Sequence, residues 1–97
     1  MPQPLQAVTE AALQDAARRS GLPVERLRVV EAAQVTWPDG SLGCPQDGMG
    51  YTQALVRGYR ILIQAGDAVI EYHAGSSGEP FHCPPERVTS PLPGDPT

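Results

Sequence analysis

The side chains best suited to chemistry in this chain belong to two cysteines and two histidines: Cys44, Cys83, His73 and His82. The cysteines lie 39 positions apart, and each precedes a proline. In the chain-entropy treatment, a disulfide that closes a loop of this length stabilises a fold by about 4 kcal/mol. We expect the disulfide in an oxidising compartment and free thiols in a reducing one, with a structural role in both cases.

The same four residues are of types that bind zinc. Adjacent residues such as His82 and Cys83 are poorly placed to ligate one tetrahedral ion, and the sequence contains no C-x-x-C or H-x-x-x-H spacing. Asp39 and Ser41 match the start of a calcium loop, but its later ligands and terminal Glu are missing. The sequence therefore predicts no metal site and no cofactor.

A thiol-dependent enzyme is the alternative reading of these residues. Cys44 would be the nucleophile, with His73 or His82 as its base and Asp39 or Asp47 orienting that base. The chain lacks the signature of a cysteine protease or a thiol oxidoreductase. We therefore lean towards a protein without catalytic residues and keep the thiol enzyme as an alternative.

Residues 36–50 contain the only Trp, one cysteine and four of the ten glycines, a composition typical of a loop with a defined shape. Within this stretch, Pro38-Asp39-Gly40 predicts a β-turn in which Asp39 bonds its own backbone. The predicted binding loop comprises Trp37, Pro38, Asp39, Gly40, Ser41, Leu42, Gly43 and Pro45, and further candidate residues are Tyr51, Gln53 and His73. In this hypothesis Leu42 is the exposed contact residue.

Length and charge restrict the possibilities further. A chain of 97 residues forms one domain, which we place at residues 1–83, and the proline-rich residues 84–97 predict a disordered tail. The net charge of −4 disfavours nucleic acid as a partner. The sequence has no segment that would span a membrane and no signal peptide, so we expect a cytoplasmic protein, or an exported one whose signal has been removed.

Hydrophobic periodicity predicts the elements that position these residues. Apolar side chains at spacings of three and four predict a helix from Leu5 to Ser20, and one further turn follows Pro23. Alternation then predicts a strand from Leu27 to Trp37, with a bulge at Ala32-Ala33.

Further alternation predicts strands over residues 51–56, 59–64 and 68–73, and a short one at 81–83. Ala65-Gly66-Asp67 predicts a hairpin turn. Tyr59 and Tyr72 are then expected in the core. Trp37 is expected either beneath the loop, where its indole would shield the loop base, or in an aromatic binding patch with the tyrosines. The predicted fold class is α+β, with an N-terminal helix packed on a four-stranded, mostly antiparallel sheet in a two-layer sandwich.

Several motifs carry a resemblance to a known family. These are Trp-Pro-Asp-Gly-Ser-Leu-Gly-Cys-Pro at 37–45, Tyr-Thr-Gln at 51–53, Gly-Tyr-Arg-Ile at 58–61, Glu-Tyr-His at 71–73 and the final Cys83. Together they resemble a small, uncharacterised family of bacterial and archaeal proteins, some of which carry export signals. The order of helix and strands is also similar to PepSY-type and cystatin-like domains, which implies the binding and restraint of peptidases.

These observations favour a non-enzymatic binding module that presents the loop 38–50 to a protein or peptide, in the manner of a peptidase inhibitor or a peptidase-associated domain. A rigid loop loses little entropy on binding, so it binds more tightly than a flexible one. The alternatives are a Cys/His metal-binding protein or thiol enzyme using Cys44, and a structural accessory domain.

Overall fold

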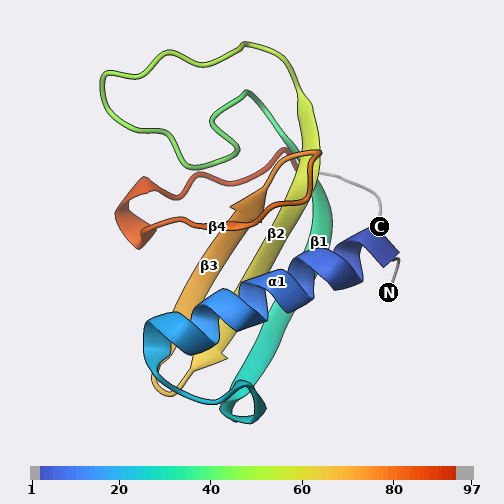
Figure 1. Cartoon of the computed structure of the whole chain (residues 1–97). Coiled ribbons are helices and arrows are strands. Elements are labelled where there is room, and N and C mark those ends of the chain that lie inside the picture. Colours follow the sequence, from blue (N-terminus) through green and yellow to red (C-terminus); the bar gives the residue numbers. More distant parts are fainter. Residues whose placement is uncertain (1–2, 94–97) are drawn as a thin grey trace.

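A computed structural model describes residues 3–93, with one helix packed against one face of a four-stranded sheet (Figure 1). The elements are α1 (Gln3–Ser20), the 3-10 turn η1 (Val24–Arg26), β1 (Leu27–Trp37), β2 (Val56–Ala65), β3 (Ala68–Ala74), β4 (Phe81–His82) and the 3-10 turn η2 (Pro85–Arg87). The predicted α+β class is confirmed. No helix within the described residues is both long enough and apolar enough to cross a bilayer.

Helix α1 lies along the sheet because it carries one apolar stripe. Leu5, Val8, Ala12 and Ala16 are all buried, as their spacing predicts. The small alanines allow the helix to approach the strands closely. The helix ends at Gly21, whose positive φ and N–H bond to the carbonyl of Ala17 are those of a C-terminal cap.

The four strands form an antiparallel meander in the order β1-β2-β3-β4. The hairpin turn between β2 and β3 fixes their register, so that Ile61 lies opposite Tyr72 and Ile63 lies opposite Ile70. These four side chains belong to the core under α1, as the alternation predicts. The register also puts Arg60 opposite His73, on the other face of the sheet.

A bulge in β1 changes which side chains face the helix. The pairing with β2 shifts between Val29 and Glu31, earlier in the strand than the predicted position at Ala32-Ala33. Because of the extra residue, alternate positions exchange faces beyond the bulge. Ala32 therefore packs against the helix-side core, whereas Trp37 lies on the opposite face, which we call the second face.

The predicted separate strand over residues 51–56 is wrong. Residues 51–55 belong to the connection, and β2 runs without interruption from Val56 through Gly58. Gly58 belongs inside the strand because a Cβ at that position would collide with the indole of Trp37 and the carbonyl of Ala74. The glycine that suggested a break instead makes room for the tryptophan.

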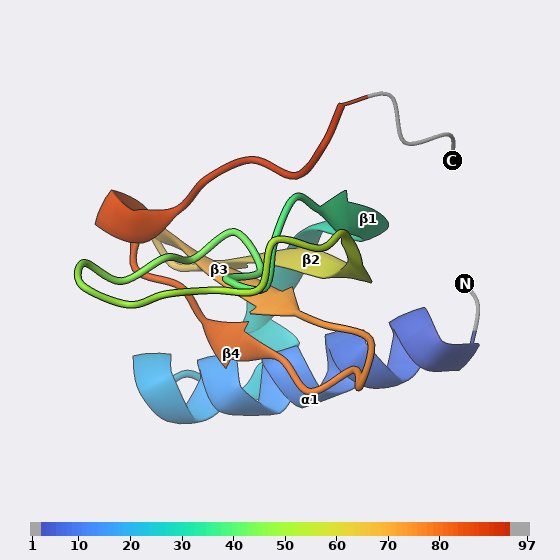
Figure 2. The ribbon, with the colours of Figure 1, turned by 90° about the horizontal axis from the view of Figure 1, so that it is seen from above.

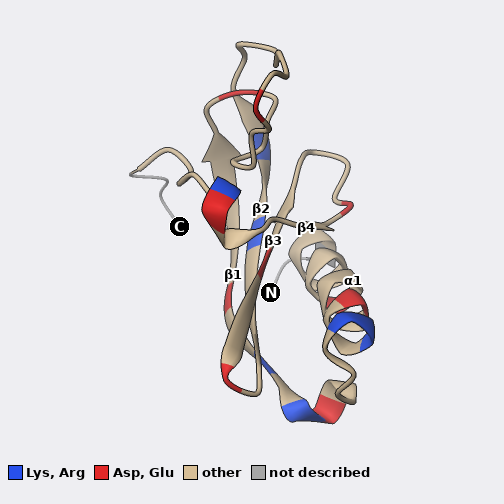
Figure 3. Ribbon diagram, turned by 90° about the vertical axis from the view of Figure 1, so that its left-hand side faces the viewer, with Lys and Arg blue, Asp and Glu red and all other residues tan. Residues whose placement is uncertain are grey.

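The second face is covered by the β1–β2 connection and by the chain after Cys83, as the perpendicular views show (Figures 2 and 3). The prediction of disorder from residue 84 onward does not hold for residues 84–92. Thr89 donates its N–H to the carbonyl of Gly43 (2.9 Å), and Leu92 donates to the carbonyl of Thr36 (2.9 Å). These bonds hold the chain across the end of β1, while residues 94–97 lie outside the described residues.

Candidate functional site

The connection between β1 and β2 has two parts that differ in burial. Residues 38–44, which we call the arm base, fold back against the second face of the sheet. Residues 45–55, which we call the arm, extend beyond the ends of the strands before the chain returns to β2 (Figure 1).

The arm base is a compact turn built on one carboxylate. Asp39 Oδ1 accepts hydrogen bonds from the Ser41 hydroxyl (2.6 Å) and the Ser41 N–H (2.9 Å), and these bonds hold the pKa of Asp39 below its usual value. Leu42 and Gly43 follow with positive φ angles of 56° and 74°. This predicted Asp-centred turn is therefore present.

The side chain of Trp37 packs beneath the arm base. It has no exposed surface, and its indole N–H donates to the carbonyl of Ala74 (3.0 Å). The ring lies so close to Gly43 and Gly58 that a Cβ at either position would overlap it. The predicted place of Trp37 beneath the loop is confirmed, and both glycines are explained by its bulk.

A disulfide joins Cys44, at the end of the arm base, to Cys83, which follows β4. Both residues are buried, and their Cα atoms lie 5.9 Å apart. Of the two states that the sequence allows, the structure thus has the oxidised one. The bond joins the arm base to the far edge of the sheet, where Cys83 also donates its N–H to the carbonyl of Glu71 (2.9 Å).

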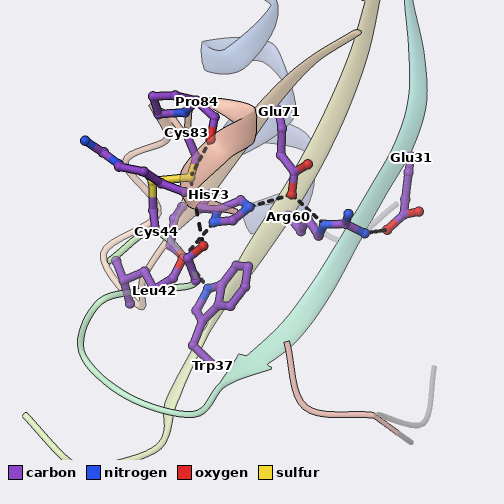
Figure 4. Close-up of polar contacts among 12 residues, drawn as sticks. Glu31, Trp37, Leu42, Cys44, Arg60, Glu71, His73, Cys83 and Pro84 are labelled. Atoms are coloured by element: carbon purple, nitrogen blue, oxygen red, sulfur yellow. Dashed lines mark hydrogen bonds and ion pairs between the residues drawn. A yellow bond between two sulfur atoms is a disulfide. The ribbon is translucent and has the colours of Figure 1, made fainter. Parts of the chain in front are cut away.

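His73 holds the arm base through a hydrogen bond to Leu42 (Figure 4). Its fully buried ring donates from Nδ1 to the carbonyl of Leu42 (2.7 Å), and its Nε2 is hydrogen-bonded to Glu71 Oε2 (2.6 Å). The same carboxylate oxygen accepts a hydrogen bond from Arg60 Nε (2.8 Å), and Arg60 Nη1 donates a second one to Glu31 Oε2 (3.2 Å). The ring also lies 4.4 Å, centroid to centroid, from the ring of Trp37.

The protonation of Glu71 depends on this network. Burial by itself would raise the pKa of Glu71, but hydrogen bonds from Arg60 and His73 outweigh burial and hold that pKa below its ordinary value. The ionised carboxylate is thus the form that the fold retains.

The geometry bears directly on the thiol and metal alternatives. Cys44 has no thiol in this structure, and both ring nitrogens of His73 already have partners. His82 lies on the other face of the sheet, where its ring is 6.1 Å from that of Tyr72. Within residues 3–93, no group of three or more His, Cys, Asp or Glu residues is placed to hold a metal ion.

The arm presents the most exposed large apolar side chains among the described residues. Leu55 is 66% exposed and Met49 is 58% exposed. Met49 lies at a turn closed by its own N–H bond to the carbonyl of Gln46 (3.2 Å), and the Tyr51 hydroxyl accepts from the N–H of Gln46 (3.0 Å). The two sides of the connection meet where Gly40 donates to the carbonyl of Thr52 (2.9 Å).

The predicted loop residues divide between the two parts of the connection. Leu42, expected to be exposed, is half-buried, because its side chain packs beside Gly75 while its carbonyl bonds His73. The other predicted residues are Trp37, Ser41 and Gly43, which are buried; Asp39, Gly40, Pro45 and Tyr51, which are half-buried; Pro38 and Gln53, which are exposed; and His73, which is buried.

Sequence reasoning missed the pairing of Arg60 with Glu71 and the exposure of Met49 and Leu55. A signal for the first was present, because Glu71 and His73 share a strand face and the predicted hairpin register puts Arg60 opposite His73. The exposure of Leu55 had no signal, since the predicted strand over residues 51–56 includes that residue, whereas Met49 lies in the predicted loop 38–50 without having been singled out.

A family model matches most of the chain. The family described as a domain of unknown function (DUF8738) matches residues 9–83. This span includes most of α1, the whole sheet, the arm and both cysteines, and it ends before η2. No curated protein and no solved structure matches the chain.

Proposed function

The chain belongs to this family of domains of unknown function, DUF8738, and from its geometry we propose that it is a non-enzymatic binding module whose arm contacts a protein or peptide partner. The observation that carries the proposal is the contrast between a rigid base and an exposed arm. The base is held by the disulfide, Trp37 and His73, whereas Met49 and Leu55 expose apolar surface to solvent.

This contrast favours binding on energetic grounds. An anchored arm loses less conformational entropy on association than a free loop, so more of the contact energy contributes to affinity. Methionine adapts its shape to different surfaces, and leucine contributes buried apolar area once a partner covers it. The contact residues in this proposal are Met49 and Leu55, in place of Leu42.

The backbone of the arm supports a finer form of the same proposal. Residues 52–55 are exposed and non-helical, and among the described residues no backbone hydrogen bond engages Gln53, Ala54 or Leu55. Free N–H and C=O groups beside an apolar side chain suit pairing with the extended backbone of a partner. A peptidase-inhibitor-like domain uses its loop in this way, and we propose that role as the specific case.

Site-specific photo-crosslinking tests the proposal. A photoreactive residue is placed at position 55 or, as a matched control, at position 69. Val69 is 54% exposed on β3 beside the β2–β3 turn, at the other end of the sheet from the arm. Each protein is irradiated in extract of the source cells. We expect a discrete adduct from position 55 only, which excess unlabelled protein competes away and which Met49→Asp reduces at least about tenfold.

Two outcomes would contradict the proposal. One is the same set of adducts from positions 55 and 69, and the other is an adduct at position 55 that Met49→Asp does not change. Either outcome, with the fold intact by circular dichroism, would favour the structural accessory domain instead.

A further inference from the structure

A pocket of about 520 Å³ lies between the start of the arm and the chain that follows β4. Pro45, Gln46 and Asp47 line one side, and residues 86–89 line the other. Its volume is within the range of pockets that bind small molecules or single side chains. Residues 86–89 lie outside the span that matches the family model.

Arg87 is the only basic residue among those that line the pocket, and its guanidinium is incompletely satisfied. Arg87 Nη2 approaches Cys44 Sγ (3.3 Å), and disulfide sulfur is a weak acceptor. Arg87 Nε is buried and has no acceptor among the described residues. Although Asp47 and Glu86 line the same pocket, no ion pair within residues 3–93 joins Arg87 to a carboxylate.

Two hydrogen bonds hold the backbone on either side of the Arg87 side chain. The N–H of Arg87 closes η2 by bonding the carbonyl of Pro84 (3.0 Å), and Thr89 is hydrogen-bonded to Gly43 in the arm base. A partly buried guanidinium with unused donors is costly unless an acceptor from outside completes it.

We propose that this pocket is a binding site for a carboxylate, which pairs with the guanidinium of Arg87. The planar guanidinium presents its donors in the geometry that a carboxylate accepts in two parallel bonds. A singly charged anion fits better than a phosphate, because Asp47 and Glu86 repel a higher negative charge. The inference rests on the proposed function only for the source of the carboxylate, which is an acidic side chain or the C-terminus of the partner that the arm holds.

Titration of the purified, oxidised protein with small probes tests the site without the partner. The side-chain Nε–H signal of Arg87, assigned by its loss in Arg87→Lys, is followed by nuclear magnetic resonance at neutral pH. Sodium acetate is the probe, and acetamide and sodium chloride are the controls. We expect a saturable shift with acetate alone, with a Kd on the order of 10 mM, as suits a ligand of four heavy atoms.

Variants and larger probes sharpen the result. Arg87→Gln should weaken acetate binding at least about tenfold at the neighbouring backbone signals, whereas Arg57→Gln, an exposed arginine outside the pocket, should leave it unchanged. N-acetylglutamate α-amide and N-acetylalanine then distinguish a side-chain carboxylate from a terminal one by which binds more tightly.

Shifts that rise without saturation, or that acetamide and chloride reproduce, would overturn the carboxylate site. The two proposals fail separately, because Met49→Ser with Leu55→Ser removes the arm contact and should leave acetate binding intact. Loss of acetate binding in that double variant would contradict the assignment to Arg87.

Discussion

At the scale of single residues, His73 is a side chain of a type common in catalytic sites that has a structural role in this chain. A histidine beside a glutamate is also the arrangement of many catalytic sites. In this chain the ring has no exposed surface, and its second nitrogen bonds the carbonyl of Leu42 instead of a nucleophile. The bond has a structural consequence, since it holds a leucine at positive φ, a conformation that is unfavourable for a residue with a Cβ.

The pH dependence of stability should report on Glu71. Its folded-state pKa lies below the ordinary value of 4.5, so its contribution is fully present above that value and is lost as the pH falls below it through the folded-state pKa. We expect Glu71→Gln to lower the free energy of unfolding at pH 7 by about 1–3 kcal/mol and to flatten its decline in acid. Urea denaturation between pH 7 and pH 3 measures both.

Glu31→Gln is the matched control, because it removes the same charge from the other end of the network. Glu31 is an exposed partner of Arg60, so its loss should cost less than about 1 kcal/mol. Equal effects of the two substitutions at every pH would show that burial at Glu71 has no special importance.

At the scale of elements, the arm base is shaped by the packing of two glycines against one tryptophan. Gly43 in the base and Gly58 in β2 both lie against the indole of Trp37. The bulge in β1 turns Trp37 to this face, so a local irregularity in one strand decides where the connection folds.

Substitution of two glycines in the connection distinguishes the free-energy cost of backbone strain from that of a packing clash. Gly43 and Gly48 have similar φ angles, 74° and 81°, but only a Cβ at position 43 would meet other atoms, those of Trp37 and of Thr89. We expect Gly48→Ala to cost about 1–2 kcal/mol, as left-handed backbone does for alanine. Gly43→Ala should cost more than about 3 kcal/mol, because the indole has no room to move. Thermal or urea denaturation of both variants measures the difference, and costs within about 0.5 kcal/mol of each other would refute tight packing at the base.

At the scale of the whole molecule, one helix and a four-stranded sheet form a small core, and long-range links close the other side. On the second face, which α1 does not cover, the Cys44–Cys83 disulfide and the hydrogen bonds of Thr89 and Leu92 hold the arm base and the chain after Cys83 against the sheet (Figure 2). Small domains bury too little apolar surface to be very stable, so such links contribute a large share of the total.

Removal of the disulfide should therefore lower the free energy of unfolding by about 4 kcal/mol. The Cys44→Ala, Cys83→Ala double variant and the wild type, each with and without reductant, are compared by urea denaturation. Because both sulfurs are buried, we also expect the native wild type to resist mild reductant until it begins to unfold. A loss below about 1 kcal/mol would mean that the remaining contacts close the second face without the disulfide.

What the sequence determined by itself is local and periodic. Alternating and helical spacings located α1, β1 and the hairpin of β2 and β3, and Gly66 fixed the register of that hairpin. The distance between Cys44 and Cys83 along the chain was sufficient to predict a link of structural value. Each of these features depends on neighbours in sequence or on a single pair of residues.

Tertiary structure alone decided which parts of the connection are buried and which are exposed. The bulge in β1 reversed the face of Trp37, and the indole then required Gly58 to lie inside β2, where a break was predicted. The hydrogen bond from His73 holds Leu42 against the sheet, whereas Met49 and Leu55 are exposed. Exposure depends on contacts between segments far apart in the chain, and the hydrophobic periodicity of the sequence does not predict those contacts.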